Sequence, residues 1–189
     1  MTKVAPKALI ALGGNLPFGE LAPEETLFRA IDALDRAGLK PLSTSRFFTT
    51  PCFPKGAGPD YVNAALVTET ELSPQDVLAI LHEVEAAFSR TRDQRWGMRT
   101  LDLDLLALDD QILPDMTVYT RWLNLPQKEQ VATAPEQLIL PHPRIQDRGF
   151  VLIPLCDVAP DWMHPALNLT VRQMADRLSP EEIREIVPI

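Results

Sequence analysis

The chain has 189 residues, of which 46% are hydrophobic and 23% are charged, values typical of about one folded globular domain. These values exclude intrinsic disorder, a collagen-like repeat and a coiled coil. A formal net charge of −8 argues against a general nucleic-acid binder, because affinity for a phosphate backbone requires a basic face. No apolar run reaches the roughly 18 residues of a membrane span. We therefore expect a cytoplasmic protein without membrane contact.

Two cysteines, Cys52 and Cys156, lie far apart in the sequence. Without an export signal, two reduced thiols are a better interpretation than a disulfide. Neither cysteine belongs to a CxxC pair, so the cysteines do not indicate zinc.

Apolar spacing predicts alternating strands and helices in the first half of the chain. Residues 8–12 form a short apolar run that ends at two glycines, as expected of a buried strand. A helix is expected after Pro23, with Gly38 where a C-terminal cap belongs. Strands are expected at 39–50 and 61–72.

A second helix should begin after Ser73, whose hydroxyl can cap it, and a strand should follow at 101–108. The order βαββαβ predicts an α+β, ferredoxin-like fold in which helices pack on an antiparallel sheet. We treat residues 1–189 as a single domain.

The spacing of apolar residues predicts structure less clearly after residue 108. Residues 111–137 contain three prolines and no sustained period, so we assign them no structure and expect a long surface excursion, with room for a short helical turn. Residues 149–159 predict a buried helix in which Pro154 produces a kink or an early stop. Residues 170–178 predict a short terminal helix.

Two acidic residues lie two positions apart on the predicted strand 101–108. Because side chains alternate along a strand, Asp102 and Asp104 share one face. Paired carboxylates with no His or Cys nearby suit Mg²⁺. Taken alone, however, such a pair is more often a solvated polar strand face.

Residues 90–99 hold four arginines against one aspartate, a basic patch in an acidic protein. Surface ion pairs explain such a patch about as well as anion binding does. The closeness of the arginines to Asp102 favours nucleotide chemistry, because a cation and guanidinium groups together stabilise a transferring phosphoryl group. The sequence has no P-loop and no dinucleotide fingerprint, so side chains must hold the anion.

The sequence RWGMRTLDLDLLAL at 95–108 resembles the signature of the hydroxymethyl-dihydropterin pyrophosphokinase family. Three further blocks are similar and occur in the family's order: ALGGN at 11–15, TTPCF with PDYVNAAL at 49–66, and PHPRIQDRGFVLIPLCDVAP at 141–160. The resemblance implies an ATP-dependent diphosphotransferase of folate biosynthesis. Its substrates would be ATP and 6-hydroxymethyl-7,8-dihydropterin, and its products AMP and the pterin diphosphate.

The resemblance also implies roles for individual residues. Asp102 and Asp104 would bind two Mg²⁺ ions, and we add the hypothesis that Asp104 accepts the hydroxyl proton. Arg90 and Arg99 would stabilise charge in the transition state. The positions that match ATP contacts are His82, Glu85, Arg92, Arg95, Arg99, His142 and Arg148.

A pterin pocket is implied as well. Its matching positions are Thr50, Pro51, Cys52, Phe53, Tyr61, Asn63, Trp96 and Phe150. The Asn63 amide would pair with the polar edge of the pterin ring, and Tyr61 and Phe150 would stack on its two faces. Trp96 would seal the site.

Some positions differ from the family pattern, namely His82, Met98 and Pro143. Residues 116–136 are expected to be an insertion that covers the nucleotide or meets a partner, and neighbouring folate-pathway enzymes are the expected partner class. Two alternative functions stay open. One is another Mg²⁺-dependent nucleotidyl or phosphoryl transferase, and the other is a non-catalytic ferredoxin-like module that binds a nucleotide.

Overall fold

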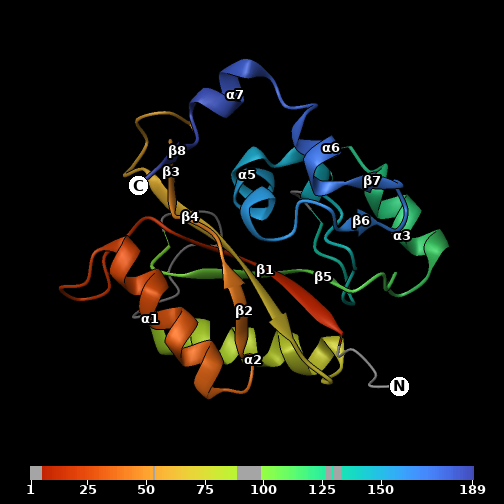
Figure 1. Ribbon diagram of the computed structural model, residues 1–189, viewed down its shortest axis with the longest axis horizontal. Helices are drawn as coiled ribbons and strands as arrows, with labels where there is room; N and C mark the ends of the chain where they lie inside the picture. The colour runs from red at the N-terminus through yellow and green to blue at the C-terminus, as the bar shows by residue number, and fades with distance from the viewer. Residues whose placement is uncertain (1–5, 53, 89–98, 127–128, 130–132) are drawn as a thin grey trace.

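The computed structural model describes residues 6–52, 54–88, 99–126, 129 and 133–189. At its centre is a six-stranded antiparallel sheet with the order β5-β1-β4-β3-β8, in which β2 also pairs with β4 (Figure 1). The strands are β1 Lys7–Gly14, β2 Pro41–Thr44, β3 Phe48–Thr50, β4 Tyr61–Glu69, β5 Asp102–Leu108 and β8 Val187–Pro188. β5 is an edge strand, and it carries the acidic pair.

Helices cover both faces of this sheet (Figure 1). The helices on one face are α1 Pro23–Arg36 and α2 Pro74–Phe88, and those on the other are α5 Gly149–Val158 and α6 Val171–Ala175. Alternation along β1 sends Ile10 to the core under α1 and α2 and Leu9 to the core under α5. The predicted α+β, ferredoxin-like architecture is confirmed.

Shorter elements complete the structure. They are α3 Met116–Leu123, the 3-10 turn η1 Ile145–Asp147, the hairpin strands β6 Met163–His164 and β7 Leu169–Thr170, and α7 Pro180–Arg184. In the described part of the chain, no helix combines the length and the apolar character that crossing a membrane requires. Both cysteines are free thiols, as predicted.

The ends of α1 follow from its sequence. Pro23 occupies the first turn, where its missing N–H costs nothing, and the Glu25 carboxylate accepts a 3.1 Å hydrogen bond from the Ala22 amide. Gly38, with a φ of 97°, lies just beyond the C-terminal end, in a conformation that favours glycine. The predicted helix is confirmed at both ends.

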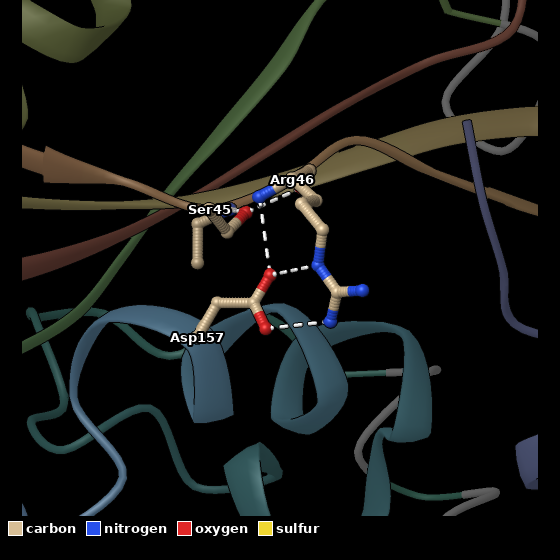
Figure 2. A network of polar contacts seen from close by, with 4 residues as sticks. Ser45, Arg46 and Asp157 are labelled. Atoms are coloured by element: carbon tan, nitrogen blue, oxygen red, sulfur yellow. Dashed lines mark hydrogen bonds and ion pairs between the residues drawn. The ribbon is translucent and has the colours of Figure 1, made fainter.

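The strand predicted at 39–50 is interrupted between β2 and β3. The Ser45 hydroxyl accepts a 2.8 Å hydrogen bond from the Ala65 amide, so a side chain replaces the backbone acceptor. Arg46 turns toward α5, where its amide and its guanidinium make three hydrogen bonds of 2.8 to 3.1 Å to the Asp157 carboxylate (Figure 2). The break therefore ties the edge of the sheet to α5.

The structure changes two expectations for the second half of the chain. The stretch 111–137 holds more than a surface excursion with a short helical turn, because it contains the eight-residue helix α3 with a buried Tyr119. The helix expected at 149–159 is present, and the early stop at Pro154 is wrong because α5 continues to Val158. Its buried position explains the continuation, since packing against β4 and α6 offsets the lost hydrogen bond.

Candidate active site

The register of three neighbouring strands brings the acidic pair close to Asn63. Gly13 on β1 lies opposite Asp102 on β5 and opposite Asn63 on β4. Directly opposed residues share a face of the sheet, so Asp102 and Asn63 lie on one face, two strands or about 10 Å apart. Leu101 and Leu103 pack under α1 and α2, so this face is the α5 face. The expected metal-binding and pterin-binding residues are therefore neighbours.

Glycine is required between these two side chains. A Cβ added to Gly13 would lie 3.1 Å from Asn63 Oδ1, which is tighter than ordinary contact. At Gly14 a Cβ would lie 2.5 Å from the Thr100 carbonyl oxygen. The two glycines therefore leave the floor of the site open and let the chain before β5 approach β1.

Each carboxylate of the acidic pair has an arginine partner. Arg99 forms an ion pair with Asp102, and Arg148 Nη1 lies 3.3 Å from Asp104 Oδ2. Burial and the neighbouring Asp104 charge raise the pKa of Asp102 above its ordinary value. Two arginines thus offset the repulsion between two carboxylates on one strand.

Helix α2 contributes Glu85 and His82 to the same region. Glu85 Oε1 accepts a 2.8 Å hydrogen bond from the Leu103 amide. This bond satisfies a backbone donor on the outer side of the edge strand. Burial raises the pKa of Glu85 to about 7. Both His82 and Glu85 face the cavity described below.

Hydrogen bonds with backbone groups hold His142 in place. Its amide donates to the Leu106 carbonyl oxygen at 2.7 Å, and its Nδ1 accepts from the Arg144 amide at 3.1 Å. Burial lowers the pKa of His142 to about 4, and the Arg148 charge acts in the same direction. The imidazole is therefore neutral near pH 7 with its proton on Nε2, where it can donate a hydrogen bond.

A cavity of about 630 Å³ joins these groups, which is within the usual range for small-molecule sites. The residues expected to bind metal or ATP that line it are His82, Glu85, Arg99, Asp102, Asp104, His142 and Arg148. Arg144 and Trp122, to which the sequence analysis gave no role, also line it. The structure thus brings together every described residue that was assigned to ATP or metal.

The described residues assigned to the pterin gather at β3 and β4. Asn63 Nδ2 donates a 2.8 Å hydrogen bond to Thr50 Oγ1, and Thr50 lies opposite Tyr61 in the sheet. Pro51 and Cys52 follow Thr50, and Cys52 Sγ accepts a 3.2 Å hydrogen bond from the Gly58 amide. These residues form a cluster beside the cavity rather than in its lining.

Two aromatic side chains connect this cluster with the acidic pair. Burial raises the pKa of Tyr61, while the charges of Arg99 and Asp102 act on the phenol in opposite directions. Phe150 is exposed in the first turn of α5, and the Arg148 guanidinium lies 5.8 Å from the centre of its ring. Both rings therefore lie within electrostatic reach of the arginines that pair with the acids.

Five residues of the expected site lie outside the described part of the chain. They are Phe53, Arg90, Arg92, Arg95 and Trp96. Their assignments stay predictions.

Asn15 is a residue of the site that the sequence analysis quoted without giving it a role. Its side chain is buried, its Oδ1 accepts from the Arg99 amide at 2.8 Å, and its Nδ2 donates to the Pro59 carbonyl oxygen at 3.1 Å. It thus links the end of β1 to both the arginine and the loop before β4. The available signal was a polar residue directly after the two glycines that end a buried strand.

An antiparallel α+β sheet that aims paired carboxylates, arginines and a neutral histidine into one cavity has the properties of a phosphate-transferring enzyme. A family model for 7,8-dihydro-6-hydroxymethylpterin-pyrophosphokinase matches residues 9–160. The chain belongs to this family, and both the predicted family and the predicted reaction class are confirmed.

Named relatives agree with this membership. Over 173 residues the chain is 35% identical to a 2-amino-4-hydroxy-6-hydroxymethyldihydropteridine pyrophosphokinase of Haemophilus influenzae, covering 89% of this chain and 93% of that protein. A protein of the same name from Synechocystis sp. is 32% identical over 182 residues, covering 96% of this chain and 80% of the relative.

Solved structures show the same fold. One, described as HPPK-DHPS in complex with substrates, superposes with a TM-score of 0.63 at 13% identity over 92% of this chain. A Plasmodium falciparum HPPK-DHPS also gives 0.63, at 15% identity over 93% of this chain. The present chain spans 43% and 44% of those two chains.

Proposed function

We propose that this chain transfers the pyrophosphoryl group of ATP to the hydroxymethyl group of 6-hydroxymethyl-7,8-dihydropterin by means of the cavity beside β5. The observation that carries this proposal is the row Asp102, Gly13 and Asn63 across three strands. Asp102, which is paired with an arginine, lies about 10 Å from the Asn63 amide, and this supports a phosphate site next to a site for a heterocycle.

Asp102 and Asp104 would hold two Mg²⁺ ions. The donor set fits, because Mg²⁺ prefers hard oxygen ligands, takes one or two carboxylates and completes its shell with water and phosphate oxygens. In the described residues, no three His, Cys, Asp or Glu side chains converge on a further metal position. When bound, Mg²⁺ would neutralise charge on the triphosphate and orient it.

The two arginines would change partners when ATP binds. Arg99 and Arg148 pair with the carboxylates in the structure, and those carboxylates are the proposed metal ligands. When the carboxylates hold Mg²⁺, the guanidinium groups of Arg99 and Arg148 would donate to the phosphate oxygens, for which they are good bidentate donors. Arg99 would then stabilise charge in the transition state. The Nε2 proton of His142 would donate to a phosphate oxygen.

The pterin would occupy the space over Gly13. Asn63, already oriented by Thr50, would pair with the polar edge of the ring, and Tyr61 and Phe150 would contact its faces. The hydroxyl oxygen would form a bond to the β-phosphorus while the bond between the β-phosphorus and the oxygen of AMP breaks. Asp104 would accept the hydroxyl proton.

Contact with neighbouring folate-pathway enzymes is part of the proposal. The solved neighbours of this fold include single chains that carry both HPPK and DHPS in their descriptions, which supports such an association.

Separation of the nucleotide products tests the proposal. The chain is incubated with ATP, Mg²⁺ and the pterin alcohol, and we expect AMP and the pterin diphosphate in equal amounts. Formation of ADP or free pyrophosphate would instead indicate another Mg²⁺-dependent transferase. Nucleotide binding without any product would indicate a non-catalytic module.

A further inference from the structure

The described residues of 113–126 and 133–140, called the α3 segment here, are joined at their outer ends by a pair of backbone hydrogen bonds. The Leu113 amide donates to the Leu140 carbonyl oxygen at 2.8 Å, and the reverse bond is 3.3 Å. Two residues beyond Leu140, the His142 amide bonds to Leu106 of β5. The segment is therefore closed at its base, directly beside the proposed nucleotide cavity.

Helix α3 has a small hydrophobic core of its own. Tyr119, Trp122 and Ile139 are buried together, separately from the two cores under the sheet. The Asp115 carboxylate caps the helix by accepting a 2.9 Å hydrogen bond from the Val118 amide. These contacts give a short helix a fixed position, which an isolated helix of eight residues would not have.

A long-range contact anchors this helix to the rest of the chain. Tyr119 Oη lies 3.0 Å from His164 Nε2, and both side chains are fully buried. Figure 1 shows α3 beside the β6–β7 hairpin, away from α1 and α2. The inner side of α3 is thus a rigid wall.

That wall faces the end of the cavity that lies away from Asp102. Asp102 and Arg148 define the charged end, and Leu78 lies seven residues before Glu85 on α2, or about 10 Å farther along the helix axis. α2 and β5 run in opposite directions (Figure 1), so Leu78 lies toward the far end of β5. Trp122 and Leu138 of the α3 segment also line the cavity, next to the polar residues Glu136 and Gln137.

A cavity with the acidic pair and its arginines at one end and with Leu78, Trp122 and Leu138 toward the other matches a nucleoside triphosphate. We propose that Trp122 is a specificity-determining residue that contacts the base of the nucleotide, and that the α3 segment forms the wall of the base subsite. The inference rests on the proposed function, since it assumes that the phosphates occupy the end at Asp102. Aromatic side chains are effective contacts for bases because every base presents a flat π-face.

The test compares two ligands, Mg²⁺-ATP and Mg²⁺-tripolyphosphate, by isothermal titration calorimetry. Tripolyphosphate carries the phosphates without a base or a sugar. For Trp122→Leu, which keeps an apolar side chain at this position, we expect the Kd for ATP to rise about tenfold. The Kd for tripolyphosphate should stay within about twofold of the wild-type value, because the charged end is unchanged. Trp122→Phe should retain most of the affinity for ATP.

A matched control separates the indole contact from the packing of the wall. Leu123 is the next residue, packs against the same cluster and does not line the cavity. Leu123→Ala should therefore leave the Kd for ATP within about twofold of wild type.

Three results would overturn the inference: an unchanged ATP affinity in Trp122→Leu, an equal weakening of both ligands, or an equal loss of ATP affinity in Leu123→Ala. A wild-type protein that binds neither ligand would instead contradict the proposed function itself, and with it the inference.

Discussion

Asn15 and Arg99 are joined by two hydrogen bonds of 2.8 Å that run in opposite directions. The Asn15 amide donates to the Arg99 carbonyl oxygen, and the Arg99 amide donates to Asn15 Oδ1. The guanidinium that pairs with Asp102 is thus held through its own backbone by a buried side chain at the end of β1. We infer that Asn15 is a positioning residue for Arg99.

Replacement of Asn15 should reduce turnover more than nucleotide binding. Asn15→Ala leaves the Arg99 amide without its acceptor, which costs about 2 kcal/mol of stability and lets Arg99 shift. We expect kcat for AMP formation to fall about tenfold or more, with the KM for ATP nearly unchanged, in steady-state kinetics.

A control variant that loses a similar amount of stability shows whether the fall in kcat is specific to the site. Thr26 is a buried residue of α1 whose hydroxyl donates to the Ala22 carbonyl oxygen at 3.0 Å. Thr26→Ala should lower the melting temperature without lowering kcat. An equal fall of kcat in both variants would mean that Asn15 acts only through stability.

The acidic pair should be dispensable for folding and essential for chemistry. Asp104→Asn removes a proposed metal ligand, so AMP formation should fall about a thousandfold or more. The side chains of Asp104 and Arg148 are 38% and 24% exposed, so their ion pair contributes little to stability. Far-UV circular dichroism and the melting temperature should therefore stay close to wild type. Ordinary turnover in this variant would contradict the metal assignment.

Arg99→Ala should show its main effect in the chemical step. If the guanidinium acts on charge that develops in the transition state, kcat falls about 100- to 1000-fold while the Kd for ATP changes much less. Arg36→Ala, which removes an exposed arginine at the end of α1, is the control of equal charge and should have wild-type kinetics. A loss confined to ATP affinity in Arg99→Ala would assign Arg99 to binding alone.

Local pattern was sufficient to predict the βαββαβ core and the acidic pair. The apolar run at 8–12 and the alternation at 101–108 each predict a strand without information from the rest of the chain. A short run of apolar residues is typical of a strand that is covered on both faces. The same alternation is enough to assign Asp102 and Asp104 to one face of the strand. Local periodicity therefore covers the part of the site that one strand carries.

Helix α3 and the role of Asn15 depend on contacts that no local pattern contains. Tyr119 and Trp122 are three positions apart, which corresponds to a single turn of a helix. In a stretch with three prolines, one such pair is too short a pattern to establish a helix. The contact that fixes α3 is made by His164, 45 residues away, and the partner of Asn15 Oδ1 is Arg99, 84 residues away. Tertiary structure was needed to find both.

The buried pair Tyr119 and His164 should make stability depend on pH. His164 Nδ1 accepts hydrogen bonds from the amides of Ala166 and Leu167 at 3.2 Å, so its neutral form is the one that fits. Burial lowers the pKa of His164 from 6.5 to about 4. Between these values the unfolded chain binds a proton and the folded chain does not, so stability falls as the pH falls.

Urea unfolding at pH 7.5 and pH 5 measures this dependence. Wild type should lose about 2 kcal/mol more than His164→Gln between the two pH values, because the variant has no titrating group at this position. His142, whose pKa is also lowered, is present in both proteins and cancels in the comparison. The same pH dependence in both proteins would mean that protonation of His164 does not oppose folding. In that case the two hydrogen bonds that His164 Nδ1 accepts would not select the neutral imidazole.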